Sequence, residues 1–119
     1  MGKSAITHIF VDFMILPGML HLPLVQAILR DGILIGAQNV SAHSEGPYTG
    51  EVSADHLANY RIESVLIGHS ERRTLLNENQ QVINDKIKQA WECDLNLIYC
   101  VGENHEQRDA EQFDEVIND

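Results

Sequence analysis

The sequence predicts an α/β fold of (βα)4 type, in which four parallel strands alternate with four helices. Four apolar runs begin near residues 9, 33, 64 and 95, and this even spacing is typical of strands joined by helical crossovers. The runs are apolar on both faces, as expected of parallel strands that helices cover. No linker or low-complexity tract interrupts the pattern, so residues 1–119 are expected to form a single domain.

The first two units are expected to contain strands at 9–16 and 33–40 and helices at 20–30 and 53–60. Pro17-Gly18 ends the first strand, and Asp31-Gly32 closes the first helix. That helix carries an apolar stripe formed by Leu24, Val25, Ile28 and Leu29. A long loop at 41–51 precedes the second helix, for which Ser53 is the expected cap. The side chains that this helix turns inward are expected to be Ala54, Leu57 and Ala58.

The last two units are expected to contain strands at 64–68 and 95–101 and helices at 79–93 and 105–119. The helix at 79–93 has the clearest amphipathic pattern, and the residues expected on its inward face are Ile83, Ile87, Ala90 and Trp91. The final helix is expected to bury Ala110, Phe113 and Ile117.

A histidine stands at the junction between the third strand and the helical segment that follows. Gly68 breaks the apolar run, and His69 comes directly after it. Ser70 and Glu71 then provide a cap-type residue and an acid in a first helical turn. Parallel α/β sheets place their chemistry between strand ends and helix starts, which favours a functional role for His69. A structural histidine is the alternative, and for an isolated histidine it would be the better interpretation.

Composition and charge exclude several classes of partner. The net charge is −10, from 18 acidic and 8 basic residues, which argues against nucleic acids and anionic membranes as partners. No apolar run approaches the roughly 20 residues of a membrane span. Cys93 and Cys100 do not have the spacing of a metal or redox motif, so a reducing, cytoplasmic location is expected. The remaining histidines lack ligand spacing, so no metal site is expected; they are His8, His21, His43, His56 and His105.

The segment Ile67-Gly68-His69-Ser70-Glu71-Arg72-Arg73 resembles the signature of the triosephosphate isomerase family. Further resemblance lies in residues 36–40, 46–54 and 99–103, and altogether it covers roughly residues 22–110. In this registration the four strands match strands two to five of the family's eight-stranded barrel. The resemblance therefore implies a partial TIM barrel, a (βα)4 half-barrel with parallel strands.

The resemblance implies an isomerase of glycolysis and gluconeogenesis that interconverts dihydroxyacetone phosphate and glyceraldehyde 3-phosphate without a cofactor. His69 would be the neutral imidazole that polarises the substrate carbonyl. A backbone amide at the helix start would donate to one ring nitrogen and leave the other N–H for the substrate. Glu71 resembles an active-site residue of the family, and a simple helix-start acid is the alternative.

Other positions gain expected roles from the same resemblance. Arg72 resembles a residue that braces the third loop, with Glu78 as its expected partner, and an exposed arginine is the alternative. Tyr48 and Thr49 lie in a loop that the family inserts into a neighbouring subunit, which implies a homodimer. An ordinary mobile loop is the alternative. Gln38 and Asn39 are expected to make structural hydrogen bonds in the barrel mouth.

The resemblance also places several family features outside these 119 residues. They are the first strand with its phosphate-gripping Asn and Lys, the catalytic Glu, the lid and the later phosphate-binding loops. Residues 1–21 match the family poorly, which suggests a truncated or rearranged sequence. Two function hypotheses follow: an isomerase, or a catalytically inert fragment that self-assembles. Self-association is expected because an open four-stranded sheet has two unpaired edges and an uncovered inner face.

Overall fold

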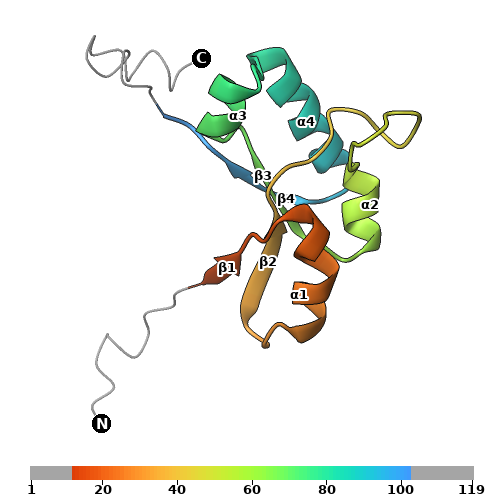
Figure 1. Ribbon diagram of the computed structural model, residues 1–119, viewed down its shortest axis with the longest axis vertical. Coiled ribbons are helices and arrows are strands. Elements are labelled where there is room, and N and C mark those ends of the chain that lie inside the picture. The colour runs from red at the N-terminus through yellow and green to blue at the C-terminus, as the bar shows by residue number, and fades with distance from the viewer. Residues whose placement is uncertain (1–11, 103–119) are drawn as a thin grey trace.

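The computed structural model describes residues 12–102, and these form one parallel sheet with the strand order β1-β2-β3-β4 (Figure 1). The strands are β1 (Phe13–Ile15), β2 (Ile33–Ala37), β3 (Ser64–Ile67) and β4 (Asn96–Tyr99). The helices are η2 (Met19–His21), α1 (Leu22–Ile28), α2 (Ala54–Asn59), α3 (Ser70–Leu75) and α4 (Gln80–Glu92). All three strand pairings are parallel, so the predicted α/β half-barrel is confirmed. The helix expected at 105–119 lies outside the described residues.

The helix-covered face of the sheet forms the core. Ala37 pairs with Val65, and both are completely buried together with Ile67 on the same face. Ile83 and Ala90 of α4 pack into this layer, because their spacing of seven residues places them on one side of the helix. Packing in the core therefore fixes the position of the carboxyl ends of β2 and β3. The polar residues that follow these two strands lie next to these ends.

The opposite face of the sheet remains open. Met14 pairs with Leu34 and Leu66 pairs with Ile98, and the two-residue alternation along each strand puts these four side chains on one side. All four are partly or largely exposed. Among the described residues, nothing covers this apolar inner face.

Two helices begin at residues whose side chains cap the first turn, and one of them, Ser53, is the expected cap. Ser53 is the N-cap of α2, where its Oγ accepts a hydrogen bond from the His56 N–H at 3.1 Å. Asn79 plays the same part for α4, where its Oδ1 accepts from the Val82 N–H at 2.9 Å. These side chains satisfy amide groups that lack partners in a first helical turn, which explains why the helices begin here.

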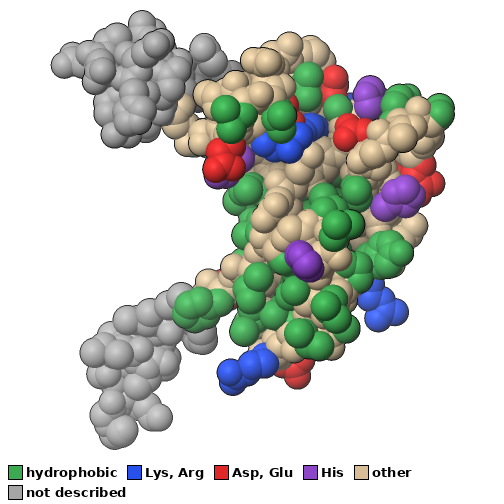
Figure 2. Space-filling view, in the orientation of Figure 1, with side chains coloured by type: hydrophobic (Ala, Val, Ile, Leu, Met, Phe, Trp, Pro, Cys, Tyr) green, Lys and Arg blue, Asp and Glu red, His purple; other side chains and the backbone are tan. Residues whose placement is uncertain are grey.

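The expected apolar stripe of the first helix is wrong at two of its four positions. Leu24 and Ile28 are exposed, and Figure 2 shows hydrophobic side chains gathered over α1. Val25 and Leu29 are partly buried as expected, and the inward side also includes Leu22 and Gln26. Leu22 is the one buried residue of this seven-residue helix, and positions 25, 26 and 29 lie on the same side of the helix as Leu22.

Two further inward positions are also wrong. Trp91 is 74% exposed, because the buried positions of α4 are Ile83, Lys86 and Ala90 and Trp91 lies beyond the edge of that face. Ala58 of α2 is exposed, whereas Ala54 and Leu57 are buried as expected. No helix within residues 12–102 is long and apolar enough to cross a membrane.

Candidate functional site

A cavity of about 400 Å³ opens at the carboxyl ends of β1, β2 and β3. Its lining combines apolar and polar side chains, namely Leu16, Met19, Gln38, Asn39, Leu66, His69, Glu71 and Arg72. Five of these residues were singled out from the sequence. The parallel topology brings them together, because the carboxyl ends of all the strands lie at the same edge of the sheet.

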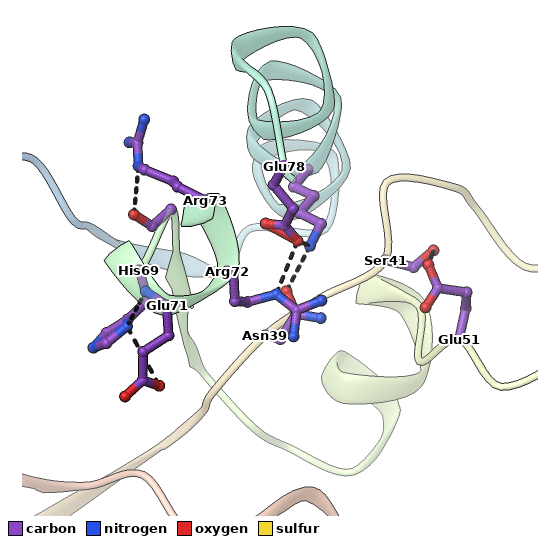
Figure 3. A network of polar contacts seen from close by, with 10 residues as sticks. Asn39, Ser41, Glu51, His69, Glu71, Arg72, Arg73 and Glu78 are labelled. Carbon is purple, nitrogen blue, oxygen red and sulfur yellow. Dashed lines mark hydrogen bonds and ion pairs between the residues drawn. The ribbon is translucent and has the colours of Figure 1, made fainter. Parts of the chain in front are cut away.

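His69 caps helix α3 through its own ring. Its Nδ1 accepts a hydrogen bond from the Glu71 N–H at 3.1 Å, and its backbone carbonyl accepts from Arg72 at 2.9 Å (Figure 3). The expectation that Ser70 would be the cap is therefore wrong, and Ser70 is the first helical residue. The imidazole nitrogen takes the place that a short polar side chain occupies in an ordinary cap, since it reaches the amide two residues ahead.

This cap determines which ring nitrogen carries a proton. A nitrogen that accepts from an amide has no proton of its own, so the remaining proton of a neutral ring lies on Nε2. The Glu71 carboxylate oxygen is 3.7 Å from Nδ1, which is too far for a hydrogen bond, and that side chain is 76% exposed. The amide contact is thus the dominant partner of Nδ1, and in the neutral form of the ring Nε2–H is the free donor.

A buried ion cluster lies beside the histidine. Arg72 Nε donates to Glu78 Oε1 at 2.8 Å, and Lys86 Nζ donates to the same oxygen (Figure 3). Lys86 Nζ also donates to Asn39 Oδ1 at 2.7 Å. The Glu78 and Lys86 side chains are only 7% and 4% exposed. The cluster therefore ties the end of β2 to both α3 and α4.

The charge balance in this cluster favours the ionised glutamate. Burial by itself would raise the pKa of Glu78, but the hydrogen bonds and positive charges of Lys86 and Arg72 outweigh it and lower the pKa. The second carboxylate oxygen, Oε2, is buried and has no hydrogen-bond partner among the described residues. A carboxylate with two cations on one oxygen is held in one orientation.

Gln38 lines the same cavity as His69, whereas Tyr48 and Thr49 do not. Gln38 Nε2 donates to the Leu16 carbonyl at 2.8 Å, which joins the ends of β1 and β2. The Tyr48 ring stacks on His43, with centroids 4.1 Å apart and planes 7° from parallel. Thr49 is exposed, and neither loop residue lines the cavity. The loop is closed at its base by a hydrogen bond from the Ser41 N–H to the Val52 carbonyl at 2.9 Å.

Sequence reasoning missed Lys86. It lies three residues after Ile83 and four before Ala90, on the buried face of α4, and a charged residue at such a position is itself a signal of a buried partner. No group of three or more His, Cys, Asp or Glu residues within 12–102 is arranged to hold a metal ion.

A parallel βα sheet with a polar cavity at the carboxyl ends of its strands is the architecture of barrel-type α/β enzymes. A family model described as "Triosephosphate isomerase" matches residues 2–119, and the chain belongs to this family. It is 40% identical over 116 residues to the cytosolic triosephosphate isomerase of Oryza sativa subsp. japonica, covering 98% of this chain and 46% of that one.

Bacterial relatives agree with this assignment. The identity is 46% over 93 residues to the triosephosphate isomerase of Nitrosomonas europaea, which covers 77% of this chain and 37% of that one. It is 51% over 75 residues to that of Bordetella pertussis, which covers 63% and 30%. The chain spans under half the length of the relatives it matches.

Proposed function

We propose that this chain supplies the carbonyl-polarising part of a triosephosphate isomerase site. The observation that carries the proposal is the His69 cap: the Nδ1 of the ring accepts from the Glu71 amide, so the proton of a neutral ring lies on Nε2 and can be donated. When a proton moves between neighbouring carbons of dihydroxyacetone phosphate and glyceraldehyde 3-phosphate, negative charge develops on the carbonyl oxygen. A fixed N–H donor at that oxygen stabilises this charge, and the reaction needs no cofactor.

The same geometry argues against Glu71 as the base for the carbon-bound proton. Among the described residues Glu71 is the one carboxylate that lines the cavity, and its carboxylate lies on the Nδ1 side of the ring, away from the Nε2–H. A base must lie within hydrogen-bond reach of the proton that it removes. We therefore propose that the base and the phosphate contacts come from segments other than residues 12–102, and that this chain alone turns over little substrate.

A coupled isomerase assay tests the role of His69. We expect the purified chain to show at most weak turnover, and His69→Gln to lower it by roughly 10²-fold or more, because the donor to the carbonyl is lost. His56→Gln, which changes an exposed histidine on α2, is the matched control and should leave the rate unchanged. Strong turnover that His69→Gln leaves intact would contradict the proposal.

A binding measurement covers the case in which turnover is too weak to compare. Adding dihydroxyacetone phosphate to ¹⁵N-histidine-labelled chain should shift the Nε2 signal of His69, and the His56 signals should not move. Strong turnover abolished by His69→Gln would support the histidine but show that a base is present in the chain.

The second candidate is a self-assembling half-barrel, and the open inner face of the sheet favours it. The order β1-β2-β3-β4 leaves β1 and β4 each with one unpaired side among the described strands. A second copy that packs on this face or pairs with these edges would bury Leu34, which is exposed, and Met14, Leu66 and Ile98, which are partly exposed. The loop with Tyr48 and Thr49 offers a separate route to a homodimer, as its family resemblance implies. A cytoplasmic location is proposed from the cytosolic rice relative.

The mass of the purified chain in solution separates these routes. We expect a species of at least twice 13.4 kDa at micromolar concentration. Leu34→Glu should dissociate an assembly that uses the inner face, whereas Thr49→Arg should dissociate one that uses the loop. Leu24→Glu, on exposed α1, is the control for added charge. A monomeric mass together with a cooperative thermal melt would contradict self-association.

A further inference from the structure

The helix that His69 caps has no apolar anchor. Helix α3 contains six residues, Ser70–Leu75, and none of them is buried. Helices of this length are not stable on their own, and most helical stability in proteins comes from packing of an apolar face. The position of α3, and with it the cap geometry of His69, must therefore depend on polar contacts.

Arg73 makes the contacts that span this junction. Its Nε donates to the Gly68 carbonyl at 2.7 Å (Figure 3). Its Nη2 donates to the Cys100 carbonyl at 2.9 Å. The guanidinium carbon lies 5.8 Å from the centroid of the Tyr99 ring. One side chain on α3 thus binds the residue just before His69 and the end of β4. Its planar fork suits two acceptors at once in a way that an ammonium does not.

Gly68 leaves the space that this contact needs. Its φ is +80°, and a Cβ added to it would lie 2.8 Å from Arg73 Nη2 and 3.3 Å from the Cys100 carbonyl oxygen. The backbone before His69 and the guanidinium therefore fit against each other. The turn is fixed on one side by the strand and on the other by Arg73.

We propose that Arg73 is a positioning residue for His69. By holding α3 against the ends of β3 and β4, it keeps the Glu71 N–H aimed at His69 Nδ1 and so keeps the proton on Nε2. The purpose of this arrangement rests on the proposed isomerase role of His69. The effect of Arg73 on the His69 ring does not depend on that role, because the nitrogen that carries the proton can be identified without substrate.

Nitrogen NMR of the full chain tests the proposal. With ¹⁵N-histidine labelling and assignment through His69→Gln, the wild type should show His69 as a single Nε2–H tautomer. In Arg73→Met the two nitrogen signals should move toward the average of both tautomers, and exchange of the Glu71 amide should rise by roughly tenfold relative to the α4 amides. Arg30→Met, which removes an exposed arginine elsewhere, should change neither measurement.

A conservative variant, Arg73→Lys, covers the case in which Arg73→Met does not fold. Arg73→Lys keeps the charge but reaches fewer carbonyls, so an intermediate shift of the His69 signals is expected. If Arg73→Met does not fold by circular dichroism, the lysine variant decides. A folded variant that is less stable yet keeps the wild-type His69 tautomer would show a merely structural arginine and overturn the proposal. Failure of the isomerase proposal would instead appear as turnover indifferent to His69→Gln.

Discussion

Replacing Glu78 by leucine should lower the free energy of unfolding by about 3–5 kcal/mol, because it leaves the buried Lys86 ammonium without its carboxylate. Removing one member of a buried ion pair costs more than the pair itself contributes, since the remaining charge cannot return to water. Chemical denaturation followed by circular dichroism measures the change. Glu63→Leu, at an exposed position, is the matched control and should stay within about 0.5 kcal/mol of the wild type.

A double variant sharpens this prediction. Glu78→Leu combined with Lys86→Met removes both charges, so it should recover part of the stability lost in Glu78→Leu alone. Equal losses in Glu63→Leu and Glu78→Leu, or a double variant whose loss is the sum of the two single losses, would contradict a coupled buried pair.

Acid should act on the same cluster. The pKa of Glu78 is lowered in the folded chain, so its carboxylate contributes stability that is fully present above the pKa of the unfolded chain. That contribution is lost as the pH falls through the lower folded pKa. The stability of the wild type should therefore decline over this acidic range, and the Glu78→Leu variant should show a shallower decline.

Replacing Gly68 by alanine should cost about 2–3 kcal/mol, because it adds a steric conflict to a backbone penalty. A non-glycine residue at φ +80° costs about 1 kcal/mol, and the new Cβ would displace the guanidinium of Arg73. Gly32→Ala isolates the backbone penalty, since its φ is +88° and a Cβ there meets no atom within 4 Å. Thermal and chemical denaturation of both variants gives the difference.

The difference in stability between the two glycine variants isolates the steric effect of the new Cβ on Arg73. A cost for Gly68→Ala that exceeds the Gly32→Ala cost by about 1–2 kcal/mol would measure the displacement of Arg73. Equal costs would show that Arg73 moves aside freely, which would also weaken its assignment as a positioning residue.

Local patterns predicted the sheet well because each strand is a short apolar run bounded by a turn signal. Runs such as Ser64–Ile67 needed no knowledge of distant residues, and the expected cap Ser53 acts within three positions. Helix phase was less predictable. The stripe expected in α1 included Leu24 and Ile28, which are exposed, and the single tryptophan at the edge of α4 was assigned to the core although it is exposed.

The candidate site likewise contains features that the local sequence predicts and features that it does not. The position of His69 at a strand end, and an amide at its ring, could be predicted from neighbouring residues. Lys86 and Asn39 are 47 positions apart, and no local pattern connects them. The contacts of Arg73 could not be predicted from the sequence either, since its acceptors are backbone carbonyls, which every residue possesses. Only the folded topology brings such groups together.

The order of strands in the sheet equals their order in the chain, which simplifies the path by which the sheet can fold. Every strand pairs with the strand next to it in sequence, so each docking step closes one crossover and no more. The entropy of closing a loop rises slowly with its length, and contacts between near neighbours in sequence form fastest. A nascent chain can therefore extend the sheet by one βα unit at a time, because the strand with which each new strand pairs has already been synthesised.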